Sequence, residues 1–343
     1  MRIAILGTGE MARGHVDAYQ AMDGVEIVAG IDTNPDRLAA FNETHGIPNG
    51  FTSIDEALAW GEFDAVSNVT PDGAHMATTL PLLAASKHVL CEKPLATSEA
   101  DAERMKEAAS KAGVINMVNL SYREVPALVE AARLVREGQI GEVRHFEASY
   151  LQSWLTQSTW GDWRTDDTWL WRLSSAHGSL GVLGDVGVHI LDFVTFGIGS
   201  DARDVSANLT TFHKADGDKI GDYVLDANDS ATMQLALKNG ATGVVHTTRF
   251  ASGHYNDLKL RIYGTKGGLD VRFENFESAL YGCLGEEALQ KAEWSALSAP
   301  QVASNYQRFV EACRAKAPAQ PDFERGAKLQ AVLDRAVESD AQS

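Results

Sequence analysis

The feature that most constrains the fold is a glycine-spaced turn near the N-terminus. The apolar run Arg2–Leu6 leads into Gly7-Thr8-Gly9-Glu10-Met11-Ala12, and a helical pattern follows. The first glycine permits a tight turn, the second lets a pyrophosphate approach the backbone, and the small sixth residue lets strand and helix pack closely. Phosphate oxygens can then bind at the positive end of the helix. The motif predicts a dinucleotide site whose contacts include Gly7, Gly9, Glu10, Met11 and Ala12.

An acidic residue ends the second strand pattern, where a dinucleotide site needs one. Asp32 comes roughly 25 residues after Gly7, close to the interval of about 20 expected for the residue that binds the adenine ribose. A carboxylate at this position also repels a 2′-phosphate, so NAD is favoured over NADP. NADP is the alternative cofactor, because Arg37 lies nearby and an arginine could pair with that phosphate.

The first 120 residues alternate short β-branched runs with helical patterns, which is typical of a parallel, doubly wound sheet. Capping sequences at Asn34-Pro35, Ser53 and Ser98 mark the starts of helices, and Gly138 ends the helical pattern Pro126–Glu137. The expected strands are Arg2–Leu6, Val25–Ile31, Ala65–Val69, His88–Cys91 and Val114–Val118.

After Gly141 the pattern changes to strands with few helices between them. One helical segment, Leu183–Phe196, interrupts the strands, and two helical patterns, Gln301–Arg314 and Phe323–Glu338, close the chain. The expected strands are Glu142–Leu151, Asp204–Phe212, Ser230–Leu237, Ala241–Phe250, Asp257–Tyr263 and Leu269–Phe273. We therefore expect an α/β chain with a dinucleotide-binding domain over residues 1–122 and an α+β domain with a largely antiparallel sheet over residues 123–343.

Residues able to carry chemistry stand at the ends of two expected strands and on the expected internal helix. In an open α/β sheet, ligands bind beyond the carboxyl ends of the strands. The candidates for cofactor contact at this edge are Thr70, Pro71, His75, Glu92 and Lys93, although a local hydrogen bond explains His75 equally well. In the second half, Asp185, His189 and Asp192 are spaced so that one helix would place all three on one face.

Taken together, these motifs resemble the glucose–fructose oxidoreductase/inositol dehydrogenase/MocA family of NAD(P)-dependent dehydrogenases. The resemblance covers nearly the whole chain and rests on the glycine turn, on Glu92-Lys93-Pro94, and on the D-x-G-x-H of Asp185 to His189. It implies a Rossmann domain and a second domain whose open sheet forms the interface of a homo-oligomer, a dimer or tetramer. It also implies that Lys93, Asp185 and His189 are catalytic. Ser179-Leu180 stands where many members continue a glycine run.

Alcohol oxidation explains why these residue types occur together. Hydride loss from carbon is coupled to proton loss from oxygen, so the site needs a base and a group that stabilises alkoxide character. His189 is a natural proton acceptor, while Lys93 can donate a hydrogen bond to the alkoxide or itself act as the base. The sequence leaves open which of the two removes the proton. Asp185 could bind another substrate hydroxyl or support the proton relay.

We therefore expect an oxidoreductase that transfers hydride between a secondary hydroxyl of a sugar or inositol-like polyol and NAD(H). Two alternatives share the fold: an NAD-dependent oxidation–elimination enzyme, and a catalytically silent NAD-dependent sugar sensor. We expect no metal, because the Asp185, His189 and Asp192 set does not complete a coordination shell.

A tryptophan-rich stretch supplies further candidates for substrate contact. Five of the seven tryptophans fall between residues 154 and 171, in a polar segment of little periodicity. Indole faces suit the apolar faces of sugars, but tryptophans also pack beneath sheets and at subunit interfaces. Besides Lys93, Asp185 and His189, the substrate candidates are Tyr122, Arg123, Trp163, Arg172 and His177.

Composition limits the partners. Among 343 residues, 47 acidic side chains outnumber 30 basic ones and give a formal net charge of −17. Nucleic acids and anionic membranes attract basic surfaces, so neither is expected as a partner. The three cysteines include no CxxC pair, and no apolar run reaches the length of about 18 residues of a membrane span. We expect a cytoplasmic protein with free thiols.

Overall fold

The computed structural model describes residues 1–158 and 160–342, and the chain divides into two compact units. The first unit contains residues 1–121 and 303–330, and the second contains residues 122–302 and the chain from 331 onward. The division expected from sequence assigned everything after residue 122 to the second domain. The structure corrects this for residues 303–330, whose apolar side chains complete the core of the first unit.

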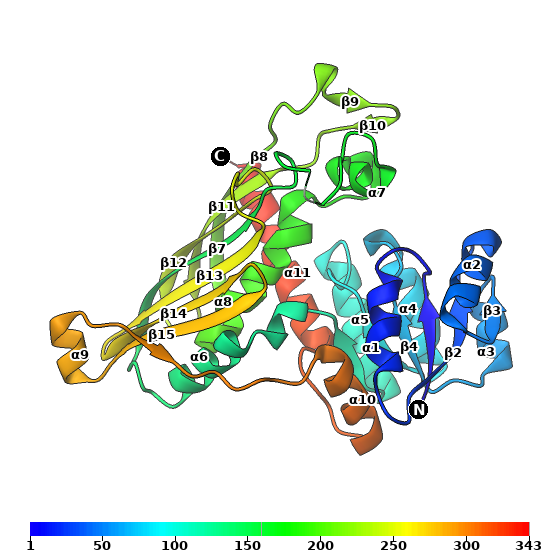
Figure 1. Cartoon of the computed structure of the whole chain (residues 1–343), viewed down its shortest axis with the longest axis horizontal. Helices are drawn as coiled ribbons and strands as arrows, with labels where there is room; N and C mark the ends of the chain where they lie inside the picture. Colours follow the sequence, from blue (N-terminus) through cyan, green and yellow to red (C-terminus); the bar gives the residue numbers. More distant parts are fainter. Residues whose placement is uncertain (159, 343) are drawn as a thin grey trace. The chain divides into compact units, whose positions relative to one another are not determined.

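The first unit contains a parallel sheet, as the sequence predicts, and this sheet has six strands (Figure 1). Its order is β3-β2-β1-β4-β5-β6. The strands are β1 (Arg2–Leu6), β2 (Glu26–Ile31), β3 (Asn49–Phe51), β4 (Ala65–Asn68), β5 (His88–Cys91) and β6 (Asn116–Val118). Strand β3 was not predicted, because its three residues give no alternating pattern. The strand order reverses between β1 and β4, and ligands of such sheets bind outside the carboxyl ends at this point.

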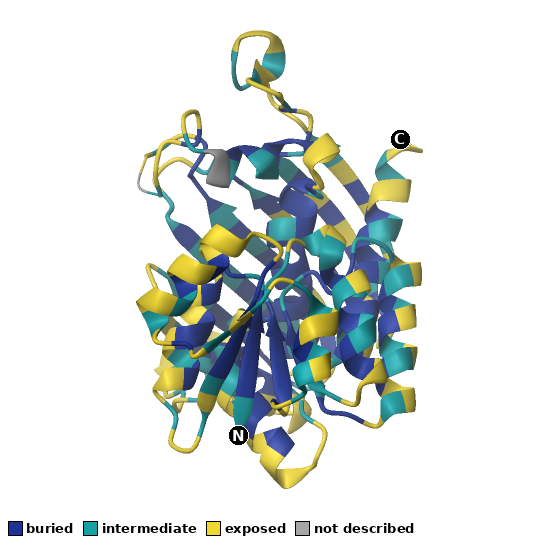
Figure 2. Ribbon diagram, turned by 90° about the vertical axis from the view of Figure 1, so that its right-hand side faces the viewer, coloured by how far each residue is buried: buried dark blue, intermediate teal, exposed yellow. Residues whose placement is uncertain are grey.

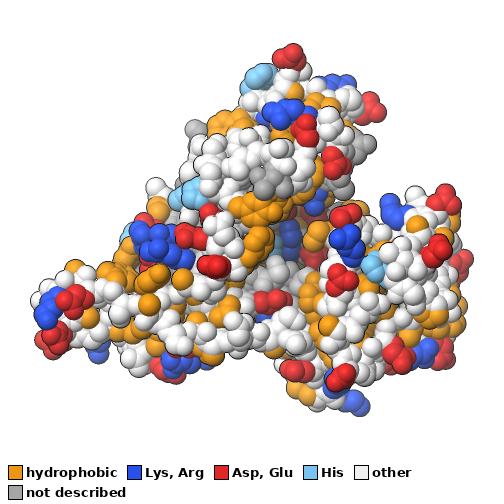
Figure 3. Space-filling view, viewed as in Figure 1, with side chains coloured by type: hydrophobic (Ala, Val, Ile, Leu, Met, Phe, Trp, Pro, Cys, Tyr) orange, Lys and Arg blue, Asp and Glu red, His pale blue; other side chains and the backbone are white. Residues whose placement is uncertain are grey.

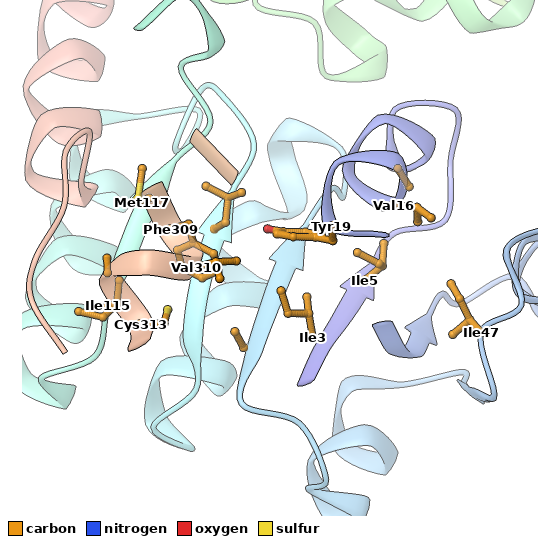
Figure 4. Close-up of a cluster of buried hydrophobic side chains, with 14 of the residues drawn as sticks. Ile3, Ile5, Val16, Tyr19, Ile47, Ile115, Met117, Phe309, Val310 and Cys313 are labelled. Atoms are coloured by element: carbon orange, nitrogen blue, oxygen red, sulfur yellow. The ribbon is translucent and has the colours of Figure 1, made fainter. Parts of the chain in front are cut away.

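Helices flank the strands of the first unit and begin where the capping sequences predict. Asn34, Ser53 and Ser98 each accept a hydrogen bond from a backbone N–H of the first turn. The helices are α1 (Ala12–Gln20), α2 (Pro35–His45), α3 (Ile54–Trp60), α4 (His75–Ala84), α5 (Glu99–Ala112) and α10 (Asn305–Ala315), with the first part of α11 (Phe323–Asp340). Figure 4 shows Phe309, Val310 and Cys313 of α10 in the same cluster as Ile3 and Ile5 of β1.

The second unit contains an eight-stranded sheet of order β16-β15-β14-β13-β7-β12-β11-β8. Its strands are β7 (Val143–Gln152), β8 (Ala202–Thr210), β11 (Ser230–Leu237), β12 (Thr242–Thr248), β13 (Asn256–Gly264), β14 (Gly267–Glu274), β15 (Glu277–Leu284) and β16 (Ser295–Leu297). Among the neighbouring strands of this sheet, within the described residues, only β7 and β12 run parallel, so the sheet is mostly antiparallel, as expected. Strands β15 and β16 extend it beyond the predicted set.

One face of this sheet is covered by α6 (Pro126–Arg136) and α8 (Val188–Ile198) (Figure 1). The alternation of β13 shows the consequence: Asn256, Leu258, Leu260 and Ile262 are buried, while the residues between them are partly exposed. The colouring in Figure 2 shows the same alternation of buried and exposed positions along the strands.

Short elements complete the second unit. A small hairpin of β9 (Lys219–Ile220) and β10 (Tyr223–Val224) projects from the sheet (Figure 1), and α7 (Asp167–Leu170) and α9 (Glu286–Lys291) are single turns or little more. A π-helical segment, η5 (Leu183–Gly187), precedes α8. Short 3-10 helices span Asp72–Ala74, Ser121–Glu124, Trp171–Leu173, Ser175–His177 and Asp216–Asp218.

The surface is charged with both signs. Acidic and basic side chains are interspersed over the face that Figure 3 shows. The three cysteines are buried free thiols. Among the helices of the described residues, none has the length and apolar character that a bilayer span requires.

Candidate functional site

The glycine turn has the geometry that its sequence predicts. Gly7 adopts a φ of +86°, and a Cβ there would lie 2.7 Å from the carbonyl oxygen of Val69, so no other residue fits without a shift. A Cβ added at Gly9 would meet no described atom within 4 Å, so the turn leaves open space above its backbone. Ala12 is fully buried against the sheet. Glu10 and Met11 are exposed at the helix start.

These features fit a dinucleotide. No described side chain caps the N-terminus of α1, so backbone N–H groups of the turn remain available to pyrophosphate oxygens. Gly9 is open at the point where the motif brings a phosphate close to the backbone. Residues Gly7 to Ala12 would hold the pyrophosphate, and Asp32 the adenine ribose.

Asp32 is an ionised carboxylate held in a dense set of donors. The backbone N–H and the hydroxyl of Thr8 both donate to Oδ2 at 2.8 Å, and the N–H of Asn34 donates to Oδ1 at 2.9 Å. Arg37 adds two bonds, from Nε to Oδ2 at 3.1 Å and from Nη2 to Oδ1 at 2.7 Å. Burial opposes ionisation, but the bonds from Arg37, Asn34 and Thr8 outweigh it and lower the pKa of Asp32 to about 2.

His75 hydrogen-bonds to both loops that follow the carboxyl ends of β4 and β5. Its Nδ1 lies 2.8 Å from the carbonyl oxygen of Pro94, and its Nε2 lies 2.8 Å from that of Thr70. Carbonyl oxygens only accept, so both ring nitrogens must carry a proton. Burial lowers the pKa of His75, but the Cys91 and Asp72 groups and the Pro94 carbonyl raise it to about 10. The local hydrogen-bonding interpretation of His75 therefore holds.

Lys93 is the second residue after β5, and its neighbour Glu92 anchors this strand end. The Lys93 N–H donates to Glu92 Oε2 at 3.2 Å, while Glu92 Oε1 accepts from Asn119 at 2.6 Å and contacts His15 Nε2 at 2.9 Å. Burial would raise the pKa of Glu92, but His15, Asn119 and the Lys93 charge bring it down to about 2. His15 belongs to α1, so the strand end that carries Lys93 is bonded to the helix of the glycine turn. Sequence reasoning did not identify His15 or Asn119.

Asp185 lies on η5, whereas His189 and Asp192 lie three residues apart on α8. Asp192 is buried and receives two bonds from Arg123, at 2.5 and 2.8 Å. The spacing of His189 and Asp192 places both on one side of α8, while Asp185 lies on the π-helical segment before it. The buried ion pair with Arg123 occupies the Asp192 carboxylate. The same pair buries Arg123, which leaves its guanidinium no surface for a substrate.

A hydrogen-bonded set of polar side chains lies beside His189. The Tyr122 ring meets the imidazole edge-on with 4.9 Å between centroids. The Tyr122 and Tyr150 hydroxyls lie 2.5 Å apart, Tyr150 donates to Asn256 Oδ1 at 2.7 Å, and Asn256 Nδ2 donates to the Tyr122 hydroxyl at 2.6 Å. Tyr122 was predicted from the sequence. Tyr150 and Asn256 were not, because no local motif marks either residue.

Arg249 is a buried guanidinium that holds Asp185. Its Nη2 donates to Asp185 Oδ2 at 3.1 Å, and its Nη1 donates to the carbonyl oxygen of Arg172 at 3.0 Å. The Arg249 side chain is fully buried, whereas the Asp185 side chain is 28% exposed. Burial lowers the pKa of Arg249, and Asp185 and Asp229 oppose that change. Sequence reasoning did not identify Arg249, which follows a strand without any motif.

The tryptophan-rich stretch mainly packs into a buried hydrophobic cluster. Trp163 is 2% exposed, donates to the Leu155 carbonyl oxygen at 3.3 Å and packs in a buried cluster, so the prediction that it contacts substrate does not fit its position. Arg172 lies over the Trp169 and Trp171 rings. His177 is exposed, with Nδ1 2.9 Å from the Ser174 hydroxyl.

The strand order, the glycine turn and the Asp32 carboxylate at the end of β2 are together typical of the dinucleotide-binding domain of an oxidoreductase. Comparison with known families agrees. Residues 1–120 match the oxidoreductase family with an NAD-binding Rossmann fold, and residues 128–270 match the GFO/IDH/MocA C-terminal domain. The chain belongs to the GFO/IDH/MocA family and is an NAD-dependent oxidoreductase.

Curated relatives and solved structures cover most of the chain. It is 30% identical to the 1,5-anhydro-D-fructose reductase of Ensifer adhaerens over 78% of this chain and 74% of that one. It is 26% identical to the levoglucosan dehydrogenase of Pseudarthrobacter phenanthrenivorans over 80% of this chain and 74% of that one. Among solved structures, an oxidoreductase domain protein from Kribbella flavida is similar with a TM-score of 0.87 and 28% identity, covering 99% of this chain and 96% of that one.

Proposed function

We propose that the chain transfers hydride between a secondary hydroxyl of a sugar or cyclitol and NAD(H), and that Lys93 and His189 handle the proton. The observation that carries this proposal is the placement of Lys93. It stands two residues beyond the end of β5, on the edge of the sheet where ligands bind, in the unit that carries the glycine turn and Asp32. Relatives named 1,5-anhydro-D-fructose reductase, levoglucosan dehydrogenase and myo-inositol 2-dehydrogenase support a sugar or cyclitol as substrate.

Bound NAD would supply the hydride acceptor. Lys93 would donate a hydrogen bond to the oxygen that gains alkoxide character, and the rigid strand end beneath it would keep the ammonium in place. His189 would take the hydroxyl proton, since imidazole titrates near neutral pH. Asp185, held by Arg249, would accept a hydrogen bond from another substrate hydroxyl and so orient the ring.

Replacement of Lys93 tests this assignment. In the Lys93→Ala variant, kcat should fall by about 10²–10⁴-fold, because the group that stabilises the alkoxide is lost. The affinity for NADH, measured by fluorescence titration, should remain within about twofold, because the glycine turn and Asp32 are untouched. Lys111→Ala is the matched control, since Lys111 is an exposed lysine of α5.

A Lys93→Ala variant that keeps kcat within a factor of a few would remove Lys93 from the mechanism. A parallel loss of NADH affinity would instead make Lys93 a cofactor-binding residue without a role in proton handling.

A further inference from the structure

A row of aromatic rings leads outward from His189 in the second unit. The centroid distances are 4.9 Å from His189 to Tyr122, 5.7 Å from Tyr122 to Phe273, and 6.3 Å from Phe273 to Phe276. Tyr255 continues the row, 5.5 Å from Phe276. We call Phe276 and Tyr255 the outer aromatic patch. Phe276 is 63% exposed, so its ring offers a free face in this unit.

The backbone holds Phe276 in a conformation that favours glycine. Glu274 pairs with Glu277, so Asn275 and Phe276 form a two-residue turn between β14 and β15, which are neighbours in Figure 1. Their φ angles are +52° and +64°. A turn with two positive φ angles is typically Asn-Gly, because a Cβ disfavours the left-handed region.

Phe276 occupies a position that favours glycine, so its backbone conformation destabilises the turn. Because the side chain is exposed, burial in a core does not offset this cost. Strained positions of this kind cluster at ligand-binding sites, where function retains them. Here the strained residue also belongs to the ring series that begins at His189. Both observations indicate that the ring of Phe276 contacts a bound ligand.

We propose that the outer aromatic patch is a carbohydrate subsite that stacks on a second ring of the substrate. The inference rests on the proposed function, and it narrows the substrate class to glycosides or disaccharides. Sugar rings present apolar C–H faces that pack against the electron-rich faces of aromatic rings. Phe276 is the third aromatic ring counted outward from His189, beside which the proposed function places the sugar ring that is oxidised. We therefore assign Phe276 to a second sugar ring, attached to the oxidised one. The class of reaction that supplies such a substrate would be glycoside release from a larger carbohydrate.

Kinetics on matched sugars test the subsite. The probes are D-glucose, cellobiose and maltose, assayed with NAD on the wild type and on Phe276→Ala and Phe276→Trp. We expect kcat/KM for at least one disaccharide to exceed that for glucose and to fall about 3–10-fold in Phe276→Ala, with glucose unchanged and Phe276→Trp near wild type. Phe212→Ala is the control, since Phe212 is an exposed ring that contacts Phe250 and not the row. Equal effects on glucose and disaccharides, or no effect, would overturn the subsite.

Thermal unfolding provides a second test of the proposal, and this test needs no substrate. Phe276→Gly and Phe276→Ala both remove the ring, but only glycine relieves the backbone. Phe276→Gly should therefore unfold at a midpoint about 2–4 °C above that of Phe276→Ala. Equal midpoints would overturn the strain on which the inference depends. If sedimentation shows that Phe276→Ala changes the oligomeric state, the patch is a subunit contact and the proposal is wrong.

Failure of the proposed function is distinguishable from failure of the subsite. If the wild type oxidises no sugar, the proposed function fails, and saturation-transfer NMR with cellobiose then decides the subsite. Transfer to cellobiose that disappears in Phe276→Ala supports it, whereas no transfer in the wild type overturns it.

Discussion

At the scale of single residues, we propose that Asp32 and Arg37 together determine the choice between NAD and NADP. The two bonds from Arg37 to Asp32 hold a guanidinium, 51% exposed, next to the carboxylate that would bind the adenine ribose. The carboxylate repels a 2′-phosphate, and while it is present it also engages the guanidinium that could bind one.

Removal of Asp32 should therefore release Arg37 for NADP. In Asp32→Ala, the ratio of NADPH to NADH affinity should rise at least about tenfold, because a charge-assisted pair with phosphate replaces a repulsion. Fluorescence titration with both reduced cofactors measures this. The double variant Asp32→Ala/Arg37→Ala is the control and should lose the gain in NADPH affinity. Unchanged preference in Asp32→Ala would refute the assignment of Asp32.

His75 should be a cation above neutral pH. Both of its acceptors are carbonyl oxygens, and its pKa is raised to about 10. Nitrogen-15 NMR of the protein at pH 8, with the signal assigned by His75→Gln, should show two protonated ring nitrogens. One unprotonated nitrogen at pH 8 would contradict the geometry.

The raised pKa of His75 also has a consequence for stability. A folded pKa above the ordinary 6.5 means that the stabilisation is complete below about pH 6.5 and is lost as pH rises toward 10. The wild type should therefore lose more unfolding free energy than His75→Gln between pH 6.5 and 10, as measured by urea denaturation at each pH. Parallel pH dependences would contradict this.

At the scale of elements, η5 and the end of β12 together set the position of Asp185. The π-helical segment needs Gly184, where a Cβ would collide with the side chain of Leu180. Arg249, directly after β12, then bonds both the Asp185 carboxylate and the Arg172 carbonyl oxygen. We therefore propose that Arg249 is a positioning residue that acts through Asp185.

Substitution of Arg249 by lysine should impair orientation of the substrate. A lysine ammonium cannot reproduce the two separate N–H directions, so Arg249→Lys should lower kcat/KM by about 10–100-fold. In an Asp185→Ala background the same change should cost little more, because the shared interaction is already lost. Arg261→Lys, at a partly exposed arginine paired with Glu147, is the control. Additive losses would contradict action through Asp185.

The sequence predicts elements and local motifs better than it predicts long-range pairs. The glycine turn, the capping residues and the parallel strands follow from spacing and hydrophobic period, and the structure contains them. The Arg123–Asp192 pair joins residues far apart in the chain, so nothing local distinguishes Arg123 from a pocket residue. Arg249 was missed for the same reason. The burial of Trp163 depends on packing that aperiodic sequence does not reveal.

At the scale of the whole molecule, the chain returns to its first unit after completing most of the second. Residues 303–330 supply Phe309 and Val310 to the first core, and α11 continues from residues of the first unit into residues of the second. Hydrophobic period predicted the two terminal helices, but it carries no information on which core they join. The family membership extends over both units, with matches to residues 1–120 and 128–270.

The most direct test of the central claim follows NADH and sugar together. The purified wild type is incubated with NAD and a panel of sugars, polyols and inositols, with absorbance at 340 nm recorded and the sugar products quantified. We predict that at least one sugar or cyclitol is oxidised at a secondary hydroxyl, with one NADH formed for each ketone. Consumption of a sugar without accumulation of NADH, or no consumption of any member of the panel, would contradict the account.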